Sequence, residues 1–225
     1  MSEKIGFIHT GAAIVNVFAK LMKEKLPQNN YFNLVDDSII KDLLKEDKDL
    51  THDLNANSSI VRRISRLVIQ AAEAGADVIM FTCSSISPAA DIVGKLVSIP
   101  VYKVDTPMAD AAISMGKNIG VLATAKTTLN PSVNLIHERA ELKGKNINVD
   151  SLLISEAFKF FLKGNMKEYD RLIIEKGIKI GEKVDVIILA QASMSHLAKE
   201  ISNKTNLPVL TSPPLAIEFL KSRVG

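Results

Sequence analysis

The sequence predicts an α/β protein of two similar lobes, each with a parallel sheet covered by helices. Two observations support this prediction. Short apolar segments alternate with helix-like segments along the 225 residues, and the order of these segments repeats once. Short runs of Val, Ile and Leu without polar alternation are typical of strands covered on both faces. Their alternation with helices favours parallel sheets joined by right-handed crossovers.

Eight segments fit buried strands. They are residues 4–9, 31–35, 77–82, 100–104, 118–123, 148–154, 185–190 and 208–211. The segments between them show the periodicity of helices, most clearly over Ile60–Ala74 and Leu172–Val184. A last helix is expected over Pro214–Arg223, and we expect it to return to the first lobe.

An internal repeat relates the two halves. In each half, an Ile-Gly strand runs into a turn of small residues, an Asp-Val-Ile strand follows, and a proline-led strand comes after the same interval. The matching points are Ile5 and Ile119, Asp77 and Asp185, and Pro100 and Pro208. The repeat predicts a first lobe of residues 1–104 plus 212–225 and a second lobe of residues 105–211, each flavodoxin-like or Rossmann-like.

Composition excludes several classes of protein. Hydrophobic residues make up 47% of the chain, mean hydropathy is +0.15, and no apolar run approaches the roughly 20 residues that span a bilayer. We therefore expect a cytoplasmic protein with no membrane partner. The net charge of +3 comes from 28 basic and 25 acidic residues without a basic stripe, which gives no support to a nucleic-acid partner.

Cofactor and metal motifs are absent from the sequence. Neither a Gly-rich dinucleotide motif nor a Gly-Lys-Ser/Thr phosphate loop occurs, so no cofactor is implied. The histidines, at positions 9, 52, 137 and 196, lack zinc-like spacing, so no metal site is expected. The single cysteine, Cys83, has no partner for an intramolecular disulfide.

Candidate functional residues follow the carboxyl ends of the predicted strands, where ligands bind in open parallel sheets. If the two lobes face each other, these loops line one cleft rich in hydroxyl groups, which suits a small carboxylate. Cys83 lies at such a strand end, just before a helix-like segment. That setting favours a reactive thiolate, although a lone cysteine can equally be a small buried apolar residue.

Three motifs at these strand ends resemble the aspartate/glutamate racemase superfamily, which includes hydantoin racemases, maleate isomerases and arylmalonate decarboxylases. They are Ile5–Gly11, Cys83-Ser84-Ser85, and Gly120–Thr124 with Thr127. The likeness covers nearly the whole chain, because the two-lobe repeat is itself the plan of that superfamily. It implies a cofactor-independent, racemase- or isomerase-type enzyme with Cys83 as acid/base or nucleophile, acting at a carbon next to a carboxylate or carbonyl.

The chain departs from the two-cysteine members of that superfamily. The repeat places Gln191 opposite Cys83, and an amide does not transfer protons at neutral pH. His9 stands where glutamate racemases carry Asp, and it is either a second base or a histidine hydrogen-bonded to its turn. A one-thiol decarboxylase, another lyase or hydrolase, and a non-catalytic carboxylate-binding protein therefore stay open as alternatives.

Hydroxyl-bearing residues at the same strand ends are the candidates for binding the substrate. They are Thr10, Ser84, Ser85, Thr124, Thr127 and Ser193, each of which could instead cap a helix. Asp105 could contact the substrate, orient His9 or cap the helix that follows it. The expected partner is a small carboxylate or carbonyl compound. Homodimers are common in the superfamily, so a homodimer is left open, but no segment indicates an interface.

Overall fold

The computed structural model describes residues 3–45, 50 and 58–224. It divides the chain into two compact units. Unit 1 comprises Met1–Asp105 with Pro213–Gly225, and unit 2 comprises Thr106–Ser212. The expected lobes divided the chain one residue earlier at both points, so Asp105 belongs to unit 1 and Ser212 to unit 2. His52 lies outside the described residues.

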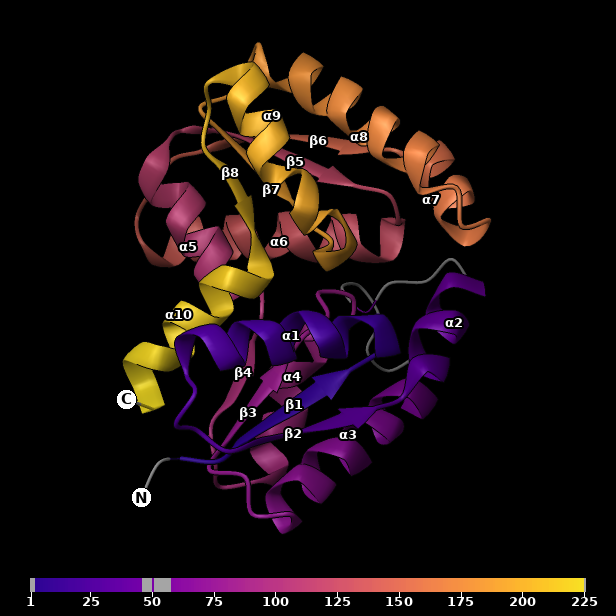
Figure 1. The fold of residues 1–225 in the computed structure, drawn as a ribbon. Helices are drawn as coiled ribbons and strands as arrows, with labels where there is room; N and C mark the ends of the chain where they lie inside the picture. Colours follow the sequence, from indigo (N-terminus) through magenta and orange to yellow (C-terminus); the bar gives the residue numbers. More distant parts are fainter. Residues whose placement is uncertain (1–2, 46–49, 51–57, 225) are drawn as a thin grey trace. The chain divides into compact units, whose positions relative to one another are not determined.

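Unit 1 is a four-stranded parallel sheet with helices on both faces (Figure 1). Its strands are β1 (Ile5–His9), β2 (Tyr31–Val35), β3 (Val78–Phe81) and β4 (Val101–Lys103), in the order β2-β1-β3-β4. Its helices are α1 (Ala12–Lys25), α2 (Asp37–Lys45), α3 (Ser58–Glu73), η1 (Ser87–Ala89), α4 (Ala90–Val93), η2 (Gly94–Leu96) and α10 (Ser212–Val224).

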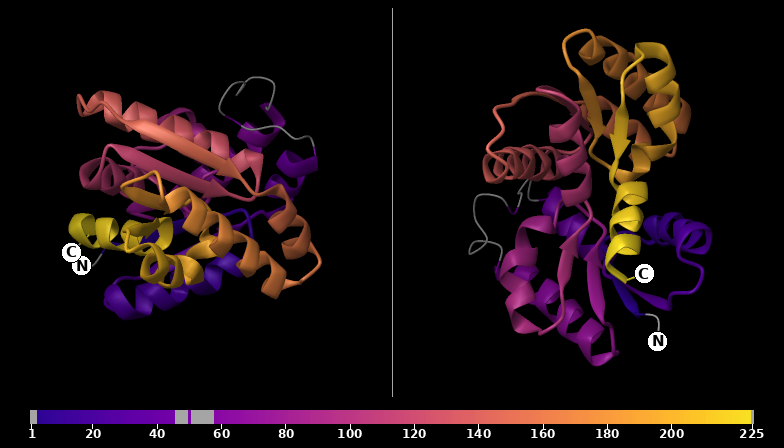
Figure 2. Two further views of the ribbon diagram at one scale, coloured as in Figure 1. Left: turned by 90° about the horizontal axis from the view of Figure 1, so that it is seen from above. Right: turned by 90° about the vertical axis from the view of Figure 1, so that its left-hand side faces the viewer.

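Unit 2 repeats this plan. Its strands are β5 (Asn118–Ala123), β6 (Asn148–Leu153), β7 (Val186–Leu189) and β8 (Val209–Thr211), in the order β6-β5-β7-β8. Its helices are α5 (Thr106–Met115), α6 (Lys126–Leu142), α7 (Ser155–Leu162), α8 (Met166–Gly181), η3 (Ala192–Leu197) and α9 (Ala198–Thr205). Two further views show helices on both faces of each sheet (Figure 2).

The predicted strands are all present, and none is shortened by more than one residue at either end. The edge strands β2 and β6 are not buried as predicted, since β2 is half-buried and β6 is largely exposed. Strand register confirms the repeat. Ile5 lies opposite Val78 in unit 1, and Ile119 lies opposite Val186 in unit 2. The next strand pair matches as well, since Ile79 faces Val101 and Ile187 faces Val209.

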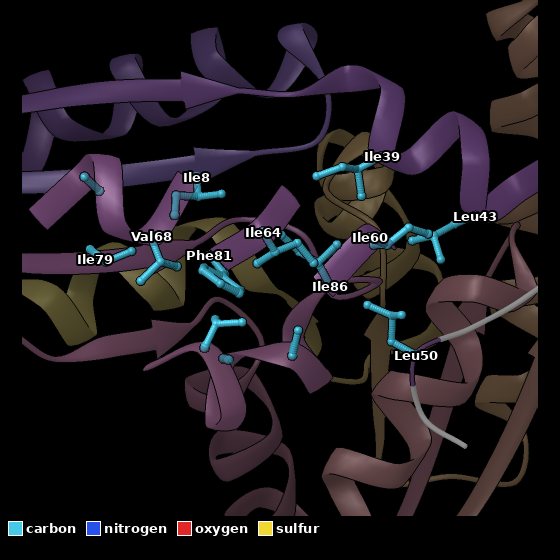
Figure 3. Packing of buried hydrophobic residues seen from close by; sticks show 14 of the residues in the cluster. Ile8, Ile39, Leu43, Leu50, Ile60, Ile64, Val68, Ile79, Phe81 and Ile86 are labelled. Carbon is cyan, nitrogen blue, oxygen red and sulfur yellow. The ribbon is translucent and has the colours of Figure 1, made fainter. Parts of the chain in front are cut away.

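Each face of the first sheet has its own apolar core. On one face, Phe7 and Met80 pack with Phe18 of α1 and with Ile217 and Leu220 of α10. Thus the last helix of the chain packs against the first sheet. On the other face, strand residues such as Ile8 and Phe81 pack against α2, α3 and α4 (Figure 3). In unit 2, β5 and β7 pack in the same way against α7, α8, η3 and α9.

In the first strand of each unit, the glycine that follows Ile5 or Ile119 permits close packing of neighbouring side chains. A Cβ on Gly6 would lie 3.2 Å from the ring of Phe32 and 3.3 Å from Cβ of Ala76. A Cβ on Gly120 would lie 3.2 Å from Ile180 and from Val184. These distances are tighter than ordinary van der Waals contact, which explains why the Ile-Gly motif recurs in both halves.

Among residues 3–45, 50 and 58–224, we find no helix with the length and apolar character that crossing a membrane requires.

Candidate active site

Cys83 lies at the carboxyl edge of the first sheet. It comes two residues after Phe81, which ends β3, and its carbonyl oxygen accepts a hydrogen bond from the Ile86 amide at 3.2 Å. This turn leads into η1 and α4. The residue is half-buried, with its side chain packed against the core cluster of Figure 3, and its thiol is free. The sulfur is therefore positioned by the core without being sealed inside it.

A buried carboxyl group lies beside the loop after β3. Asp105 follows the end of β4 and is 1% exposed. Its Oδ1 lies 3.0 Å from Oγ of Ser87, and the same Ser87 Oγ lies 3.4 Å from the carbonyl oxygen of Cys83. Burial raises the pKa of Asp105, against the smaller opposing influence of hydrogen bonds from Ser84 and Ser87. Its described side-chain contacts are with this loop rather than with His9.

His9 is fully buried at the end of β1, beside the rings of Phe7 and Phe18. Its Nε2 lies 2.8 Å from Asn33 Oδ1, and its Nδ1 lies 2.7 Å from Thr82 Oγ1. Burial lowers the pKa of His9, with a smaller opposing effect of Asn33. Burial favours a neutral ring, in which Nε2–H donates to Asn33 and Nδ1 accepts from Thr82, whose hydroxyl also lies 3.0 Å from the carbonyl oxygen of Ile8. Both ring nitrogens are thus occupied by protein side chains.

Gln191 occupies the place in unit 2 that Cys83 has in unit 1, two residues after the end of its strand at Leu189. Its Oε1 accepts hydrogen bonds from the Thr124 amide at 2.5 Å and from the Thr124 hydroxyl at 2.8 Å. Thr124 is buried. Because the amide oxygen of Gln191 is used in this way, its Nε2 hydrogens are the donors that remain for a ligand.

Further hydroxyl groups lie at the carboxyl edge of the second sheet. Tyr169 of α8 is fully buried, and its hydroxyl lies 2.9 Å from Oγ of Ser193. Burial raises the pKa of Tyr169, against the smaller effects of Ser193 and Thr124. Thr127, in the first turn of α6, is 2% exposed, and its Oγ1 has no hydrogen-bond partner among the described residues. That hydroxyl is available to a ligand.

The predicted site residues therefore fall into two groups, one on each unit. The first group follows β1, β3 and β4 and comprises His9, Thr10, Cys83, Ser84, Ser85 and Asp105. The second group follows β5 and β7 and comprises Thr124, Thr127, Gln191 and Ser193. All of them are buried except Cys83, Gln191 and Ser193, which are half-buried.

Three residues with contacts at these edges were not predicted: Asn33, Thr82 and Tyr169. Asn33 is a polar residue inside an apolar strand, and that anomaly is a signal that could have found it. Thr82 and Tyr169 carry no such signal. In the part of the chain that the structure describes, no three His, Cys, Asp or Glu side chains group as metal ligands.

Comparison with solved structures shows the same fold. Allantoin racemase from Klebsiella pneumoniae is 14% identical with a TM-score of 0.71, covering 99% of this chain and 88% of that chain. The aspartate racemase of Picrophilus torridus is 20% identical with a TM-score of 0.68, covering 98% and 94%. Glutamate racemase from Aquifex pyrophilus is 20% identical with a TM-score of 0.67, covering 99% and 84%.

Comparison of the sequence with curated proteins gives no match. The Asp/Glu/Hydantoin racemase family model, in contrast, matches residues 5–220, which is nearly the whole chain. The match includes both repeats and every predicted site residue. It agrees with the fold that the solved racemases share with this chain and supports an enzyme of the racemase type. The chain therefore belongs to the Asp/Glu/Hydantoin racemase family.

Proposed function

We propose that this protein is a cofactor-independent isomerase that moves a proton at a carbon next to a carboxylate or carbonyl group, with Cys83 as the acid/base. The observation that carries the proposal is the half-buried thiol at the carboxyl edge of the first sheet, in a chain of the racemase family. A thiolate there removes the proton from one face of the carbon. Isomerisation follows when water returns a proton to the opposite face, whereas return by the same thiol gives exchange only.

The carbanion formed in this reaction is an enediolate or enolate, so its oxygen atoms gain negative charge. Hydrogen-bond donors aimed at those oxygens stabilise the transition state. We assign this role to the hydroxyl groups of Thr127 and Ser193 and to Nε2 of Gln191. The Thr127 hydroxyl, which has no hydrogen-bond partner among the described residues, supports the assignment. Thr10, Ser84 and Ser85 are the corresponding candidates in unit 1.

The contacts of His9 favour a supporting role for it. Both of its nitrogens are bonded to side chains, and a neutral, fully buried ring is a poor proton acceptor for a substrate. We propose that His9 holds Thr82, the residue before Cys83, and that Cys83 alone exchanges the proton. Proton transfer then takes place on one face of the carbon.

Gln191 favours decarboxylation of a malonate-type acid as a second candidate function. An amide cannot carry a proton to the opposite face, so a racemase with Cys83 alone lacks its second base. In a decarboxylase, the bond to the leaving carboxylate breaks and CO₂ departs. The electron pair stays on the carbon, and the Cys83 thiol protonates that carbon on one face. This reaction needs one thiol only.

The test measures exchange of the α-proton into deuterated solvent and release of CO₂. The substrates are a panel of amino acids, hydroxy acids, hydantoins and malonates. We expect Cys83→Ala and Cys83→Ser to lower the rate by about 10²- to 10⁴-fold, the usual contribution of a positioned acid/base. Gln191→Ala, the matched variant in unit 2, should lower kcat more than it raises KM, because it removes a donor to the charge that develops in the transition state.

The outcomes separate the candidates. Exchange with inversion at the carbon and without CO₂ release supports the isomerase, and CO₂ release from malonates supports the decarboxylase. A wild-type protein that catalyses neither reaction with any acid of the panel contradicts both candidates and favours a binding protein. Catalysis that survives both Cys83 substitutions contradicts the role of the thiol.

A further inference from the structure

Asp105 is the most deeply buried carboxyl group beside the reactive loop, and the proposed reaction does not use it. The Val104 amide donates to the Phe81 carbonyl at 3.0 Å, which holds the end of β4 next to the end of β3. Asp105 follows directly and faces the loop of Cys83 and Ser87. Its Oδ1 contacts Ser87, while its Oδ2 is buried with no partner of hydrogen-bonding geometry among the described residues.

The hydroxyl of Ser87 faces two acceptors and has one hydrogen. The carbonyl oxygen of Cys83 lies 3.4 Å from Oγ, and Oδ1 of Asp105 lies 3.0 Å from it. If Asp105 were ionised, Ser87 could donate its one hydrogen to only one of these two oxygens, and the Cys83 carbonyl would keep only its hydrogen bond from the Ile86 amide. If Asp105 carries a proton, it donates to Ser87, and Ser87 donates to Cys83. Only the protonated carboxyl satisfies both contacts.

We propose that Asp105 is a neutral positioning residue, which donates its proton to Ser87 and through Ser87 fixes the turn that carries Cys83. The proposal rests on the proposed role of Cys83 and deepens it. Asp105 does not touch the substrate in this scheme. It keeps the Cys83 peptide in place, and its neutrality avoids a negative charge that would disfavour the thiolate.

The surroundings of Asp105 agree with a neutral carboxyl. Burial raises its pKa. The one cation acting on it among the described groups is Lys103 of β4, and Lys103 is already paired with Asp91 of α4 at 2.6 Å. Its hydrogen-bonding neighbours from the β3–α4 loop, Ser84 and Ser87, are uncharged. No described cation is therefore free to hold the ionised form.

The repeat supplies a matched control. Ser195 in η3 of unit 2 stands where Ser87 stands in η1, and the position that corresponds to Asp105 is Pro213. Ser195 is thus a serine in the same local structure without a carboxyl neighbour. The effect of Ser87→Ala can be compared directly with that of Ser195→Ala.

The experiment measures alkylation of Cys83 by iodoacetamide, in which the thiolate sulfur forms a bond to carbon and iodide leaves. Since Cys83 is the only cysteine, the reaction has no background from other thiols. We expect Asp105→Asn to keep the wild-type rate within about twofold up to neutral pH, because its amide N–H also donates to Ser87. Asp105→Ala and Ser87→Ala should change the rate by about fivefold or more, and Ser195→Ala should not change it.

Two outcomes would overturn the proposal. If Asp105→Asn changes the alkylation profile as much as Asp105→Ala does, the carboxyl is not a neutral donor. If none of the Asp105 and Ser87 variants changes it, neither residue positions the thiol. If Asp105→Ala fails to fold, the alkylation rates of Ser87→Ala and Asp105→Asn still test the proposal.

A second measurement addresses the proton directly. The carboxyl-carbon signal of Asp105 is identified by its absence from the spectrum of Asp105→Asn. It should keep the NMR shift of the protonated form at neutral pH. Titration near the ordinary value of about 3.9 would contradict the proposal. Neither alkylation nor NMR requires a substrate. A failure of the proposed enzyme activity would therefore leave this result standing, and the reverse also holds.

Discussion

The two units share their sheet order and register, yet their carboxyl edges differ in chemistry. Unit 1 carries a thiol, a neutral buried histidine and a buried carboxyl group: Cys83, His9 and Asp105. At the matching edge, unit 2 carries the amide of Gln191 and the hydroxyl groups of Thr124, Thr127, Ser193 and Tyr169. The thiol of the first set is the proposed proton-transfer group, whereas the second set offers hydrogen-bond donors and acceptors.

At the amino edges of the two sheets, in contrast, an aspartate accepts the same kind of backbone hydrogen bond in both units. Asp77 accepts a hydrogen bond from the Lys4 amide at 2.7 Å, and Asp185 accepts one from the Asn118 amide at 2.7 Å. Each aspartate joins the start of one strand to the start of the next. The repeat therefore preserves the contacts that build the sheet and varies the residues beyond its carboxyl ends. This contrast suggests one chemically reactive edge and one binding edge.

The largest expected effect is a loss of stability when a core residue is truncated, and it tests whether the cores of the two units contribute equally. Ile79 and Ile187 hold the same register in β3 and β7, and both are fully buried. Truncation of each to Ala should lower the free energy of unfolding by about 2–5 kcal/mol, through lost burial and a new cavity. Denaturant unfolding followed by circular dichroism measures it. A loss below about 1 kcal/mol at either site would break the equivalence.

The next prediction compares the stability lost on truncating Cys83, at the carboxyl edge of unit 1, with that lost on truncating Gln191, at the matching edge of unit 2. Gln191→Ala leaves the buried Thr124 amide without its acceptor and should cost about 1–3 kcal/mol of stability. Cys83→Ala removes a half-buried sulfur and should cost less than about 1 kcal/mol, although it should remove catalysis. Equilibrium unfolding of both variants measures the difference.

Gln191→Glu is the control for this pair, because its carboxylate still accepts from Thr124 and should recover most of the loss. Equal stability of Gln191→Ala and the wild type would show that the Thr124 contact contributes nothing. The distinction between Cys83 as a reactive residue and Gln191 as a structural residue would then rest on the thiol alone.

The strands could be predicted because buried parallel strands leave short apolar runs that helices do not imitate. The repeat added independent support, since each run in one half predicted its counterpart in the other. The exact first and last residues of the strands were less predictable. Residues such as Asp77 and Ala190 continue the apolar or extended pattern but lie just outside the ladders of β3 and β7.

The candidate site could be predicted only where a residue lies beside a strand end. Cys83 and Gln191 were found in this way, because their place in the repeat is visible in the sequence. The hydrogen-bond partners of His9 could not be found in this way, since Asn33 is 24 residues away and its contact depends on strand pairing. Tyr169 likewise reaches Ser193 from the chain's eighth α-helix. Such contacts come from tertiary packing and leave no local pattern.

The smallest effect expected concerns His9, whose counterpart in unit 2 is Ala123. Burial lowers the pKa of His9, so the unfolded chain binds a proton more readily than the folded one. The stability that neutral His9 contributes is therefore fully present above the unfolded value of about 6.5, and it is lost as the pH falls from there toward the lowered pKa. His9→Gln, which cannot titrate, should show a flatter decline of the free energy of unfolding on acidification. Urea unfolding at a series of pH values measures the difference in slope, with the alkaline values as the internal reference. An identical slope in both proteins would mean that folding does not lower the pKa of His9, and the proposal that burial keeps this ring neutral next to Thr82 would have to be abandoned.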